Sequence, residues 1–589
     1  MCGLVGEFRF DGTQPVLKNV LSAMTALERR GPDSGGHWLE GPLAFGHRRL
    51  SVIDLSDQAN QPMVDEKLGL ALVFNGAIYN YRELRAQLID LGYEFFSHGD
   101  TEVILKAYAH WGLGCVERLT GMFAFALWDR KQQSVFLARD RFGIKPMYYA
   151  LDDKRIRFAS NVQALLKMGD IDTSIDTQAL HNQFTLHGVV PAPRTIFKGV
   201  RKLPPAHTMM ISSNGKTWIQ KYWRLKATRP VEKKSEQEWR EAIHGALMAA
   251  VKKRIEVADV PVGVLLSGGL DSSLLVALLM EAGVKDLRTF SIGFEDIGQE
   301  QGSEFEFSDQ VVARYNTRHE KIYIPNSQVL TRLPEAVDAM SEPMFGQDAV
   351  AFYLLSEQVS KQVKVVQSGQ GADEVFGGYF WYPRMDKAQG SELDRFASNY
   401  FDRDHEEYAR MITSEYMSGD YTSELVQSWF DEKDADEFMD KVFRADVCNL
   451  IVDDPVKRVD NMTMAWGLEA RVPFLDHELV ELAAQMPKEY KLGSEGKHIL
   501  KEISRPLLPA GVIDRPKGYF PMPALKYVRG EFLDFMRDIL NSQACKERGL
   551  YNRDYVDLLL KEPEQHHTRI QGSKLWHMAL LEFWLQRQL

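Results

Sequence analysis

One segment restricts the possible fold more than any other: GVLLSGGLDSSLLVALL, residues 263–279. Its apolar run reads as a buried strand, its two glycines make a turn, and a helix begins after Asp271. The backbone N–H groups of Gly268 and Gly269 can approach an anion closely, and the helix N-terminus adds partial positive charge. No lysine stands where a Walker A loop has one. The segment therefore predicts a phosphate-binding turn of another kind.

Two more apolar runs further along the chain end at polar or glycine-containing positions. SIGF covers residues 291–294, and VKVVQSGQGADE covers residues 363–374. These runs alternate with helical stretches, as the buried strands and crossover helices of a parallel sheet do. Because ligands bind at the carboxyl ends of parallel strands, we expect all three segments to line one nucleotide crevice.

The first part of the chain has a different pattern. Short alternating segments such as LALVFNGAIYNY (residues 70–81) and GMFAFALWDR (residues 121–130) favour a layered, mostly antiparallel sheet. Helical patterns lie between them, which indicates an α+β domain. A chain of 589 residues is too long for one core. We expect a first domain over residues 1–225 and a second over residues 226–589, α/β at first and mainly helical from about residue 390.

Composition excludes several classes of protein. The formal net charge of -11 argues against a surface built for nucleic acid, which favours basic patches. The first residues show no secretory signal, and the most apolar window is interrupted by Ser, Gly and Asp and falls short of a membrane span. The four cysteines lie far apart, and the histidines show no ligand spacing. We expect a cytoplasmic protein without nucleic-acid or membrane partners, and the pattern indicates no structural metal.

Cys2 directly follows the initiator methionine. Removal of Met1 would leave a free α-amine, with a pKa of about 7.7 to 8, beside a thiol with a pKa of about 8.5. The amine could then act as the base for its own nucleophile. Taken alone, Cys2 could equally be an early residue with no role.

Four downstream segments give Cys2 a context. With them the chain resembles the N-terminal-nucleophile glutaminase domain of glutamine-dependent amidotransferases; they are RRGPDSGG (residues 29–36), GHRRLSVIDL (46–55), FNGAIYNY (74–81) and GDTEVIL (99–105). The resemblance implies that Cys2 attacks the glutamine side-chain amide, and that Asn75 and the amide of Gly76 form the oxyanion hole.

The same resemblance implies how glutamine is held. Arg49, beside Leu50 and Ser51, would bind the substrate carboxylate bidentately, and Asp100 would bind its ammonium group. Relatives usually have an acidic residue after the Asn-Gly pair, and this chain has Ala77. We therefore expect Asp100 to carry the ammonium contact alone, with altered glutamine binding as a consequence.

The SGGxDSS string resembles the pyrophosphate loop of ATP pyrophosphatases, which break ATP between the α- and β-phosphates. The resemblance implies an ATP and pyrophosphate site formed by Leu265, Ser267, Gly268, Gly269, Asp271, Ser272, Ser273, Ile292, Ser368 and Gly369. Asp271 and Asp373 are the expected ligands of Mg²⁺, which would bridge to phosphate oxygens. A strand-turn-helix junction that uses Gly and Ser only for geometry is the weaker alternative.

The two motif sets together specify one reaction: glutamine, ATP and an acceptor carboxylate give glutamate, AMP, pyrophosphate and an amide. Nearly the whole chain resembles the class B, glutamine-hydrolysing asparagine synthetases, including DNMTMAWGLEARVPFLDHELVELA (residues 460–483) and GKHILKE (496–502). On that resemblance Lys497 is a catalytic cation that stabilises charge on the reacting centre. A solvated helix lysine is the alternative. For Glu469 and Arg471 we favour a buried structural ion pair.

Gln370 departs from the pattern. Asparagine synthetases usually read SGEGADE here, and their first Glu can accept a proton from the attacking ammonia; Gln370 keeps the shape but drops the charge. Either the proton leaves by another route, or the acceptor differs. We favour a changed acceptor, because SEPMFGQDAVAFYLLS (residues 341–356), SGQGADEVFGGY (368–379) and DRPKGYFPMPALKYV (514–528) resemble the N-acetylglutaminylglutamine amidotransferase branch, which makes a bacterial osmolyte.

That branch implies an acceptor site containing Gln370 and Asp373 for an acetylated dipeptide, which has no free α-amine. Tyr519 and Phe520 could shape a longer pocket. Aspartate is the alternative acceptor. A β-lactam synthetase would not need the Cys2 set, a phosphoribosyl amidotransferase would not need SGGLDSS, and a non-catalytic scaffold would not be expected to keep both. The sequence does not determine the oligomeric state, for which a homodimer is the working hypothesis.

Overall fold

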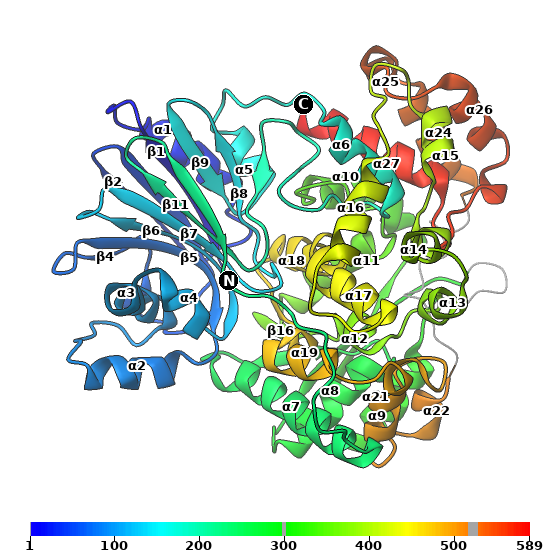
Figure 1. The fold of residues 1–589 in the computed structure, drawn as a ribbon, viewed down its shortest axis with the longest axis horizontal. Helices are drawn as coiled ribbons and strands as arrows, with labels where there is room; N and C mark the ends of the chain where they lie inside the picture. The colour runs from blue at the N-terminus through cyan, green and yellow to red at the C-terminus, as the bar shows by residue number, and fades with distance from the viewer. Residues whose placement is uncertain (1, 297–301, 516–527) are drawn as a thin grey trace.

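The computed structural model describes residues 2–296, 302–515 and 528–589 (Figure 1). Tyr519 and Phe520, considered above for the acceptor pocket, lie outside the described residues. A β-rich part, formed by the beginning of the chain, lies beside an α/β part whose later segments are helical (Figure 1). The two parts have separate sheets and touch along a broad face.

The β-rich part contains two six-stranded sheets, with strand orders β10-β8-β9-β1-β3-β2 and β12-β11-β7-β6-β5-β4. All strand pairings within both sheets are antiparallel. The strands are β1 (Gly3–Arg9), β2 (Ser34–Glu40), β3 (Leu43–Arg49), β4 (Met63–Asp65), β5 (Leu70–Ile78), β6 (Gly121–Asp129), β7 (Ser134–Arg139), β8 (Tyr148–Leu151), β9 (Arg155–Ala159), β10 (Arg201–Lys202), β11 (His207–Ser212) and β12 (Thr217–Lys221).

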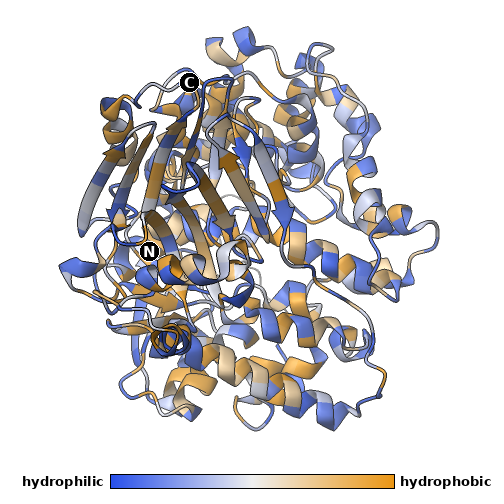
Figure 2. Ribbon diagram, turned by 60° about the vertical axis from the view of Figure 1, so that its left-hand side comes forward, coloured by the Kyte–Doolittle hydropathy of each residue, from blue (hydrophilic) through white to orange (hydrophobic). Residues whose placement is uncertain are grey.

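The two sheets pack face to face around apolar side chains, and their strands carry hydrophobic residues along their length (Figure 2). Phe8 and Phe45 from one sheet share a cluster with Val73 and Trp128 from the other. Helices α1 and α5 contact the first sheet and α3 contacts the second. The helices of this part are α1 (Leu17–Thr25), α2 (Tyr81–Asp90), α3 (Asp100–Trp111), α4 (Cys115–Arg118) and α5 (Val162–Leu166). Helix α6 (Thr177–Thr185) lies instead among the later helices (Figure 1). The predicted α+β layered sandwich is confirmed.

The α/β part is built on a five-stranded parallel sheet of order β15-β14-β13-β16-β17. Its central strand is the one that the sequence placed before the phosphate turn. The strands are β13 (Val262–Leu265), β14 (Arg288–Phe294), β15 (Arg318–Ile324), β16 (Val365–Gln367) and β17 (Glu469–Arg471), and the helices among them include α7 (Glu236–Glu256), α8 (Leu270–Glu281), α9 (Phe305–Tyr315), α10 (Asn326–Asp338) and α11 (Asp348–Val359). The predicted parallel-sheet domain is also confirmed.

The later part of the chain is mainly helical, as the sequence predicted. Two short π-helical turns, Asp446–Leu450 and Val452–Val456, interrupt it before α18. The helices are α12 (Ala372–Phe376), α13 (Trp381–Lys387), α14 (Glu392–Tyr400), α15 (His405–Met411), α16 (Tyr421–Asp431), α17 (Phe438–Ala445), α18 (Lys457–Met464), α19 (His477–Ala484), α20 (Glu489–Leu492), α21 (His498–Ser504), α22 (Ala510–Ile513), α24 (Gly530–Asn541), α25 (Gln543–Arg548), α26 (Arg553–Lys561) and α27 (Lys574–Gln588).

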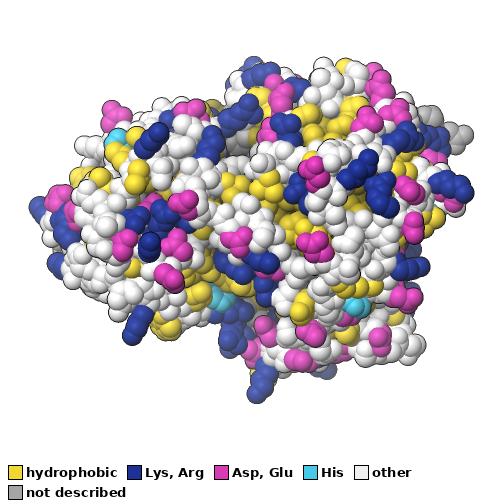
Figure 3. Space-filling model, turned by 90° about the horizontal axis from the view of Figure 1, so that it is seen from above, with side chains coloured by type: hydrophobic (Ala, Val, Ile, Leu, Met, Phe, Trp, Pro, Cys, Tyr) yellow, Lys and Arg dark blue, Asp and Glu magenta, His cyan; other side chains and the backbone are white. Residues whose placement is uncertain are grey.

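No helix in the described ranges has both the length and the apolar character that a bilayer crossing requires. On the face seen in Figure 3, positive and negative side chains lie interspersed rather than gathered by sign.

A buried ion triad joins the two parts. Asp460 of α18 accepts hydrogen bonds from Arg30 Nη1 at 2.8 Å and from Lys145 Nζ at 3.0 Å, both from the β-rich part. All three side chains are buried. Burial alone would raise the pKa of Asp460, but the Arg30 and Lys145 charges outweigh it and lower the pKa to about 2. The interface therefore depends on Asp460 remaining charged.

We expect Asp460→Asn to loosen this interface, because two buried cations would lose their counter-charge. Breaking a buried pair in this way costs about 3–5 kcal/mol. Thermal denaturation should show a clearly lower Tm. In the wild type, the folded pKa lies below the ordinary value, so the stabilisation by Asp460 is complete above about pH 4 and is lost as the pH falls toward 2.

Glu94→Gln serves as the control, because Glu94 pairs with Lys67 on the surface with both side chains 87% exposed. Such a pair contributes about 0–1 kcal/mol. Equal Tm values for the two variants would contradict the role assigned to the triad.

Candidate active sites

Cys2 lies at the start of β1, where the two sheets meet. Gly3 of β1 pairs with Arg48 of β3, so the next position outward brings Cys2 beside Arg49. The facing sheet contributes Asn75 from β5, whose Oδ1 accepts a hydrogen bond from the backbone N–H of Cys2 at 3.1 Å. The Nδ2 donor of Asn75 is buried without a partner among the described residues. A donor in that condition suits an incoming oxyanion.

Burial and nearby groups act on the pKa of the Cys2 thiol in opposite directions. Burial raises its pKa, while the Leu50 N–H and the positive charge of Arg49 act in the opposite direction.

Gly76 follows Asn75, and a Cβ at Gly76 would lie 2.2 Å from the carbonyl oxygen of Met122. Only glycine fits there, because β5 and β6 approach too closely for any side chain.

Arg49 is held rigidly by the loop that follows it. Its Nη1 donates to Ser56 O at 2.9 Å and to Asn60 Oδ1 at 2.8 Å, and its Nη2 donates to Asp54 O. The adjacent Ser51 N–H donates to Asp33 Oδ2 at 2.7 Å. The guanidinium that the sequence assigned to a substrate carboxylate is thus oriented before any ligand binds.

Asp100 begins α3, and its Oδ2 accepts a hydrogen bond from Ile78 N–H at 3.0 Å. It is 5% exposed, and burial raises its pKa to about 6. Ala77, which stands where relatives have an acidic residue, is fully buried among apolar side chains. Asp100 is consequently a buried carboxylate whose pKa lies closer to neutral pH than that of an ordinary aspartate.

The predicted ion pair of Glu469 and Arg471 is confirmed. Arg471 Nε donates to Glu469 Oε1 at 2.6 Å within β17, and both side chains are buried. Burial would raise the pKa of Glu469, yet nearby positive charge, including Arg471, lowers it to about 2. The pair contributes to the electrostatic environment of Cys2 and Asp100, since its charges affect both pKa values.

A pocket, called the strand-end pocket from here on, lies at the carboxyl ends of β13, β14 and β16. It gathers nine of the residues that the sequence assigned to nucleotide and acceptor binding, together with seven that it did not. The lining residues are Leu265, Leu266, Ser267, Asp271, Ser272, Phe290, Ser291, Ile292, Glu304, Asp348, Phe352, Leu355, Ser368, Gly369, Gln370 and Asp373.

The turn after β13 is shaped by its glycines and serines. Gly268 has φ +79°, and a Cβ there would lie 2.7 Å from Ser308 N. Ser272 Oγ accepts from Ser267 N at 3.2 Å and lies 3.1 Å from Ser267 Oγ, which accepts from Gly269 N at 3.3 Å. Ser273 differs from its neighbours: it is fully buried, does not line the pocket, and its hydroxyl has no partner within the described ranges.

Lys497 bridges the two carboxylates predicted to bind a cation. Its Nζ lies 2.5 Å from Asp271 Oδ2 and 2.8 Å from Asp373 Oδ1. Burial opposes the charge on Lys497, but the two carboxylates raise its pKa above the ordinary value. The ammonium group shows that this carboxylate pair suits a positive ion.

Close packing holds Lys497 in place. The residue is 8% exposed and adopts φ +56° just before α21. Gly378 makes room for it, because a Cβ at Gly378 would lie 2.2 Å from Lys497 Cε and 2.1 Å from Asp373 Oδ1. Lys497 is therefore a buried site lysine and not a solvated helix lysine.

Gln370 lies half-buried on the pocket wall, and no hydrogen bond of its side chain occurs within the described part of the chain. Asp348 lines the same pocket and pairs with Arg458 Nη1 at 3.2 Å. Burial raises the pKa of Asp348, whereas Arg458 lowers it. Asp348 was not predicted as a site residue, although it lies inside segment 341–356.

Arg515 was also missed. Its Nη2 pairs with Glu304 at 3.0 Å and would lie 3.5 Å from a Cβ placed on Gly269. A guanidinium is thus held beside the phosphate turn from a segment far along the chain. Sequence spacing gave no signal for this contact, because only the fold brings the two segments together.

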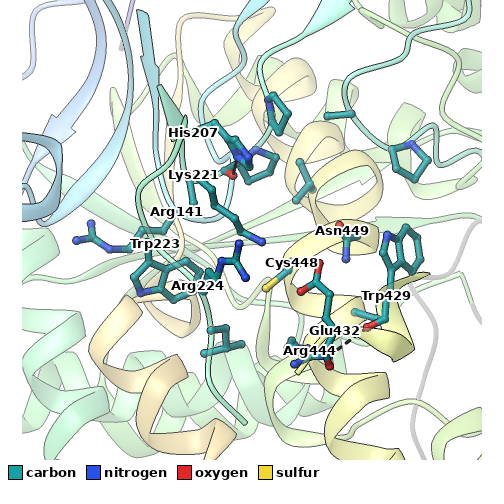
Figure 4. A pocket seen from close by; sticks show the side chains of 18 of the residues that line it. Arg141, His207, Lys221, Trp223, Arg224, Trp429, Glu432, Arg444, Cys448 and Asn449 are labelled. Atoms are coloured by element: carbon teal, nitrogen blue, oxygen red, sulfur yellow. Dashed lines mark hydrogen bonds between the residues drawn. The ribbon is translucent and has the colours of Figure 1, made fainter. Parts of the chain in front are cut away.

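Another hollow lies between the β12 end of the β-rich part and helices α16 and α17. Figure 4 shows Lys221 and Arg224 on one side of it, with Glu432 and Cys448 on the other. None of the residues that the sequence assigned to catalysis or binding lines it. The strand-end pocket, in contrast, gathers nine of the residues predicted for nucleotide and acceptor binding.

Comparisons with known proteins match a family to each half of the chain. The family described as "Asparagine synthase" matches residues 242–586, and "Glutamine amidotransferase domain" matches residues 1–223. "Asparagine synthetase [glutamine-hydrolyzing] 1" of Bacillus subtilis is 30% identical, covering 99% of this chain and 96% of its own length. "Asparagine synthetase [glutamine-hydrolyzing] 3" of the same organism is 31% identical, covering 95% and 93%.

A more distant relative carries a different name. "Amidase chry2" of Gibberella zeae is 28% identical, covering 86% of this chain and 85% of its own length. Among solved structures, glutamine phosphoribosylpyrophosphate amidotransferase of B. subtilis complexed with ADP and GMP covers 52% of this chain and 70% of its own, with 16% identity. Its TM-score of 0.29 is too low to carry an argument.

We expect Gly378→Ala to displace Lys497 from its carboxylates, because the added methyl overlaps Lys497 Cε and Asp373 Oδ1. Overpacking of this kind costs about 1–3 kcal/mol. A crystal structure and the Tm of the variant would measure both effects. Gly245→Ala on α7 is the matched control, since a Cβ there meets no atom within 4 Å. An unmoved Lys497 in Gly378→Ala would show that the contact is not restrictive.

Proposed function

Because this chain belongs to the glutamine-hydrolysing asparagine synthetase family, we propose that it amidates the carboxylate of an acetylated dipeptide, N-acetylglutaminylglutamine. The family defines the chemistry: the protein is a carbon–nitrogen ligase that takes its amido nitrogen from glutamine and uses ATP. The proposal adds the acceptor and the residues that act. The observation that carries the acceptor is Gln370 on the wall of the strand-end pocket, which is uncharged and whose side chain has no hydrogen bond to any described residue.

In the glutaminase half, we assign the nucleophile to Cys2. Its thiol attacks the glutamine amide carbon, and the developing negative charge on the amide oxygen is stabilised by Asn75 Nδ2 and the Gly76 N–H. Arg49 binds the glutamine carboxylate and Asp100 binds its ammonium group. Support comes from the buried, unpartnered Nδ2 of Asn75 and from the preoriented Arg49 guanidinium.

In the synthetase half, ATP is a substrate that binds at the strand-end pocket, with its phosphates against the turn that contains Gly268 and Gly269. Adenylation gives the acceptor carboxylate a good leaving group, AMP, and releases pyrophosphate. Mg²⁺ fits Asp271 and Asp373, because the Lys497 ammonium already pairs with both carboxylates. When bound, Mg²⁺ neutralises charge on the phosphate oxygens. Lys497 then stabilises the charge that develops on the departing phosphate.

The acceptor proposal rests on the absence of a carboxylate at position 370 of the pocket wall. A free α-ammonium is best met by a carboxylate, and Gln370 offers an amide that can donate and accept hydrogen bonds instead. An acetylated dipeptide presents amide groups and no ammonium. Asp348 does not replace the missing charge, because it is already paired with Arg458.

Aspartate is the second candidate acceptor. It is favoured by the names of two relatives, both asparagine synthetases, that are 30% and 31% identical over nearly the whole chain. We further propose a domain boundary between residues 225 and 226, a cytoplasmic location and a homodimer; each remains a prediction.

The proposed role of Asp100 predicts a pH dependence. Its pKa of about 6 means that the carboxylate is charged above pH 6 and progressively neutral below it. We expect kcat/KM for glutamine to fall about tenfold per pH unit below pH 6, since this ratio reports ionisations of the free enzyme. Asp100→Asn should raise KM and flatten that limb of the profile. An acid limb that persists in the variant would assign the ionisation to another group.

An acceptor panel tests the proposed function. Purified protein is mixed with glutamine, Mg²⁺ and ATP, and the amidated product is identified by mass alongside pyrophosphate release. We expect N-acetylglutaminylglutamine to be amidated and aspartate not. Asparagine as the product from aspartate would overturn the dipeptide proposal.

The same assay tests Gln370. We expect Gln370→Glu to lower dipeptide amidation about tenfold, because a half-buried carboxylate would add an uncompensated charge to the pocket. Gln328→Glu is the control, since it makes the same chemical change at an exposed position on α10. Equal rates for both variants would remove Gln370 from the acceptor site.

A further inference from the structure

Two histidines and one aspartate meet in the interior far from both reaction sites in the sequence. His187 follows α6, Asp402 follows α14, and His577 lies on α27. Asp402 Oδ2 lies 2.9 Å from His187 Nδ1 and 3.5 Å from His577 Nδ1. The ligand atoms of all three residues lie within 4.8 Å of one another. Three remote segments thus bring two imidazoles and a carboxylate to one point.

The cluster leaves polar atoms without partners. His577 is fully buried, and neither of its ring nitrogens has a hydrogen-bond partner in the described part of the chain. Asp402 Oδ1 is in the same condition. A neutral imidazole always carries one N–H and one lone pair, so both are unsatisfied here. Leaving buried polar groups in this way is costly, and an ion or water is the usual explanation.

The surroundings hold His577 in position. Phe345 stacks on its ring with centroids 4.3 Å apart, and a Cβ on Gly572 would lie 2.9 Å from its Nε2. Nε2 is therefore enclosed by backbone, and Nδ1 is the nitrogen directed at Asp402. The ring cannot turn away to find another partner without disturbing this packing.

A similar trio elsewhere shows the contrast. His181, His405 and Asp420 also lie within 4.8 Å, but His181 Nε2 is 3.1 Å from His405 Nδ1, and His181 Nδ1 is 2.7 Å from Thr422 Oγ1. Hydrogen bonds among protein groups satisfy both nitrogens of His181. That cluster needs no ion. In the other one His187 Nδ1 is hydrogen-bonded to Asp402 Oδ2, but both ring nitrogens of His577 and Asp402 Oδ1 have no such bond within the described residues.

We propose that His187, Asp402 and His577 bind a divalent transition metal ion, of which Zn²⁺ is the best chemical fit. Two imidazole nitrogens and one carboxylate oxygen are a common zinc ligand set, with water in the fourth position. Mg²⁺ does not suit nitrogen ligands. The ion links the segment after α6, within residues 1–223, to α27 near the C-terminus. Its role is to hold together three segments that are remote in the chain.

The test uses the full chain treated with EDTA and then given ZnCl₂. After gel filtration, elemental analysis should find one equivalent of zinc per chain. Zinc should raise the Tm above that of the EDTA-treated protein, because binding to the folded state alone stabilises it. Co²⁺ in place of Zn²⁺ should give visible absorption bands typical of imidazole coordination. Absence of bound zinc together with an unchanged Tm would overturn the proposal.

Two ligand variants locate the ion. His187 has φ +55°, a conformation that asparagine also tolerates, so His187→Asn removes a ligand without adding backbone strain. His577→Gln removes the second imidazole. Loss of even an outer-sphere partner weakens metal binding about 10–100-fold, so each variant should weaken zinc binding at least tenfold.

His405→Gln is the matched control, because it removes a histidine from the hydrogen-bonded trio and should leave zinc binding intact. Zinc binding that survives both His187→Asn and His577→Gln would overturn the assignment. So would zinc binding that is lost only in His405→Gln, since the ion would then lie at His181.

Discussion

The contact on which the synthetase half depends is the Lys497 ammonium between Asp271 and Asp373. It ties together three segments: the first turn of α8, the first turn of α12 and the residue before α21. None of these could hold its charge alone, because each side chain is largely buried and needs an opposite charge. Gly378 is required at the same point, since any side chain there would overlap the contact. The strand-end pocket has its shape because this pair of carboxylates is neutralised from within the protein.

The glutaminase half depends on a different arrangement. Cys2 begins a strand of one sheet, and Asn75 lies in the other, so the nucleophile and the donor for its oxyanion are held by the packing of two layers. Two buried acidic groups of this half and its surroundings have pKa values shifted in opposite directions. The pKa of Asp100 is raised toward neutral pH, and the pKa of Glu469 is lowered by its cationic neighbours. Burial acts on both in the same direction, and the adjacent positive charge decides the outcome.

Buried charge also holds the two halves against each other. Asp460 reaches from α18 to Arg30 and Lys145, and Lys202 pairs with Glu342 and Asp453 at 2.9 Å each. Buried ion pairs add little net stability compared with apolar packing, but they penalise any arrangement that separates them. A metal ion at His187, Asp402 and His577 would act in the same way on three segments that are remote in the chain. Apolar clusters also extend through both halves, and the buried ion pairs specify how the halves align.

Much of this protein could be predicted from the sequence. The apolar strand before Ser267, the glycines after it and the alternation of strands and helices determined a parallel sheet with a phosphate turn, because these are local patterns of periodicity and turn chemistry. Cys2 and the segments around Arg49, Asn75 and Asp100 determined the glutaminase. Tertiary structure alone decided which remote residues meet. It placed Arg515 beside Gly269, Asp348 on the pocket wall, Lys497 between two carboxylates and His577 beside Asp402, contacts between segments whose spacing in the chain carries no period. Such contacts depend on how whole helices and sheets pack, and a local pattern contains no information about that packing.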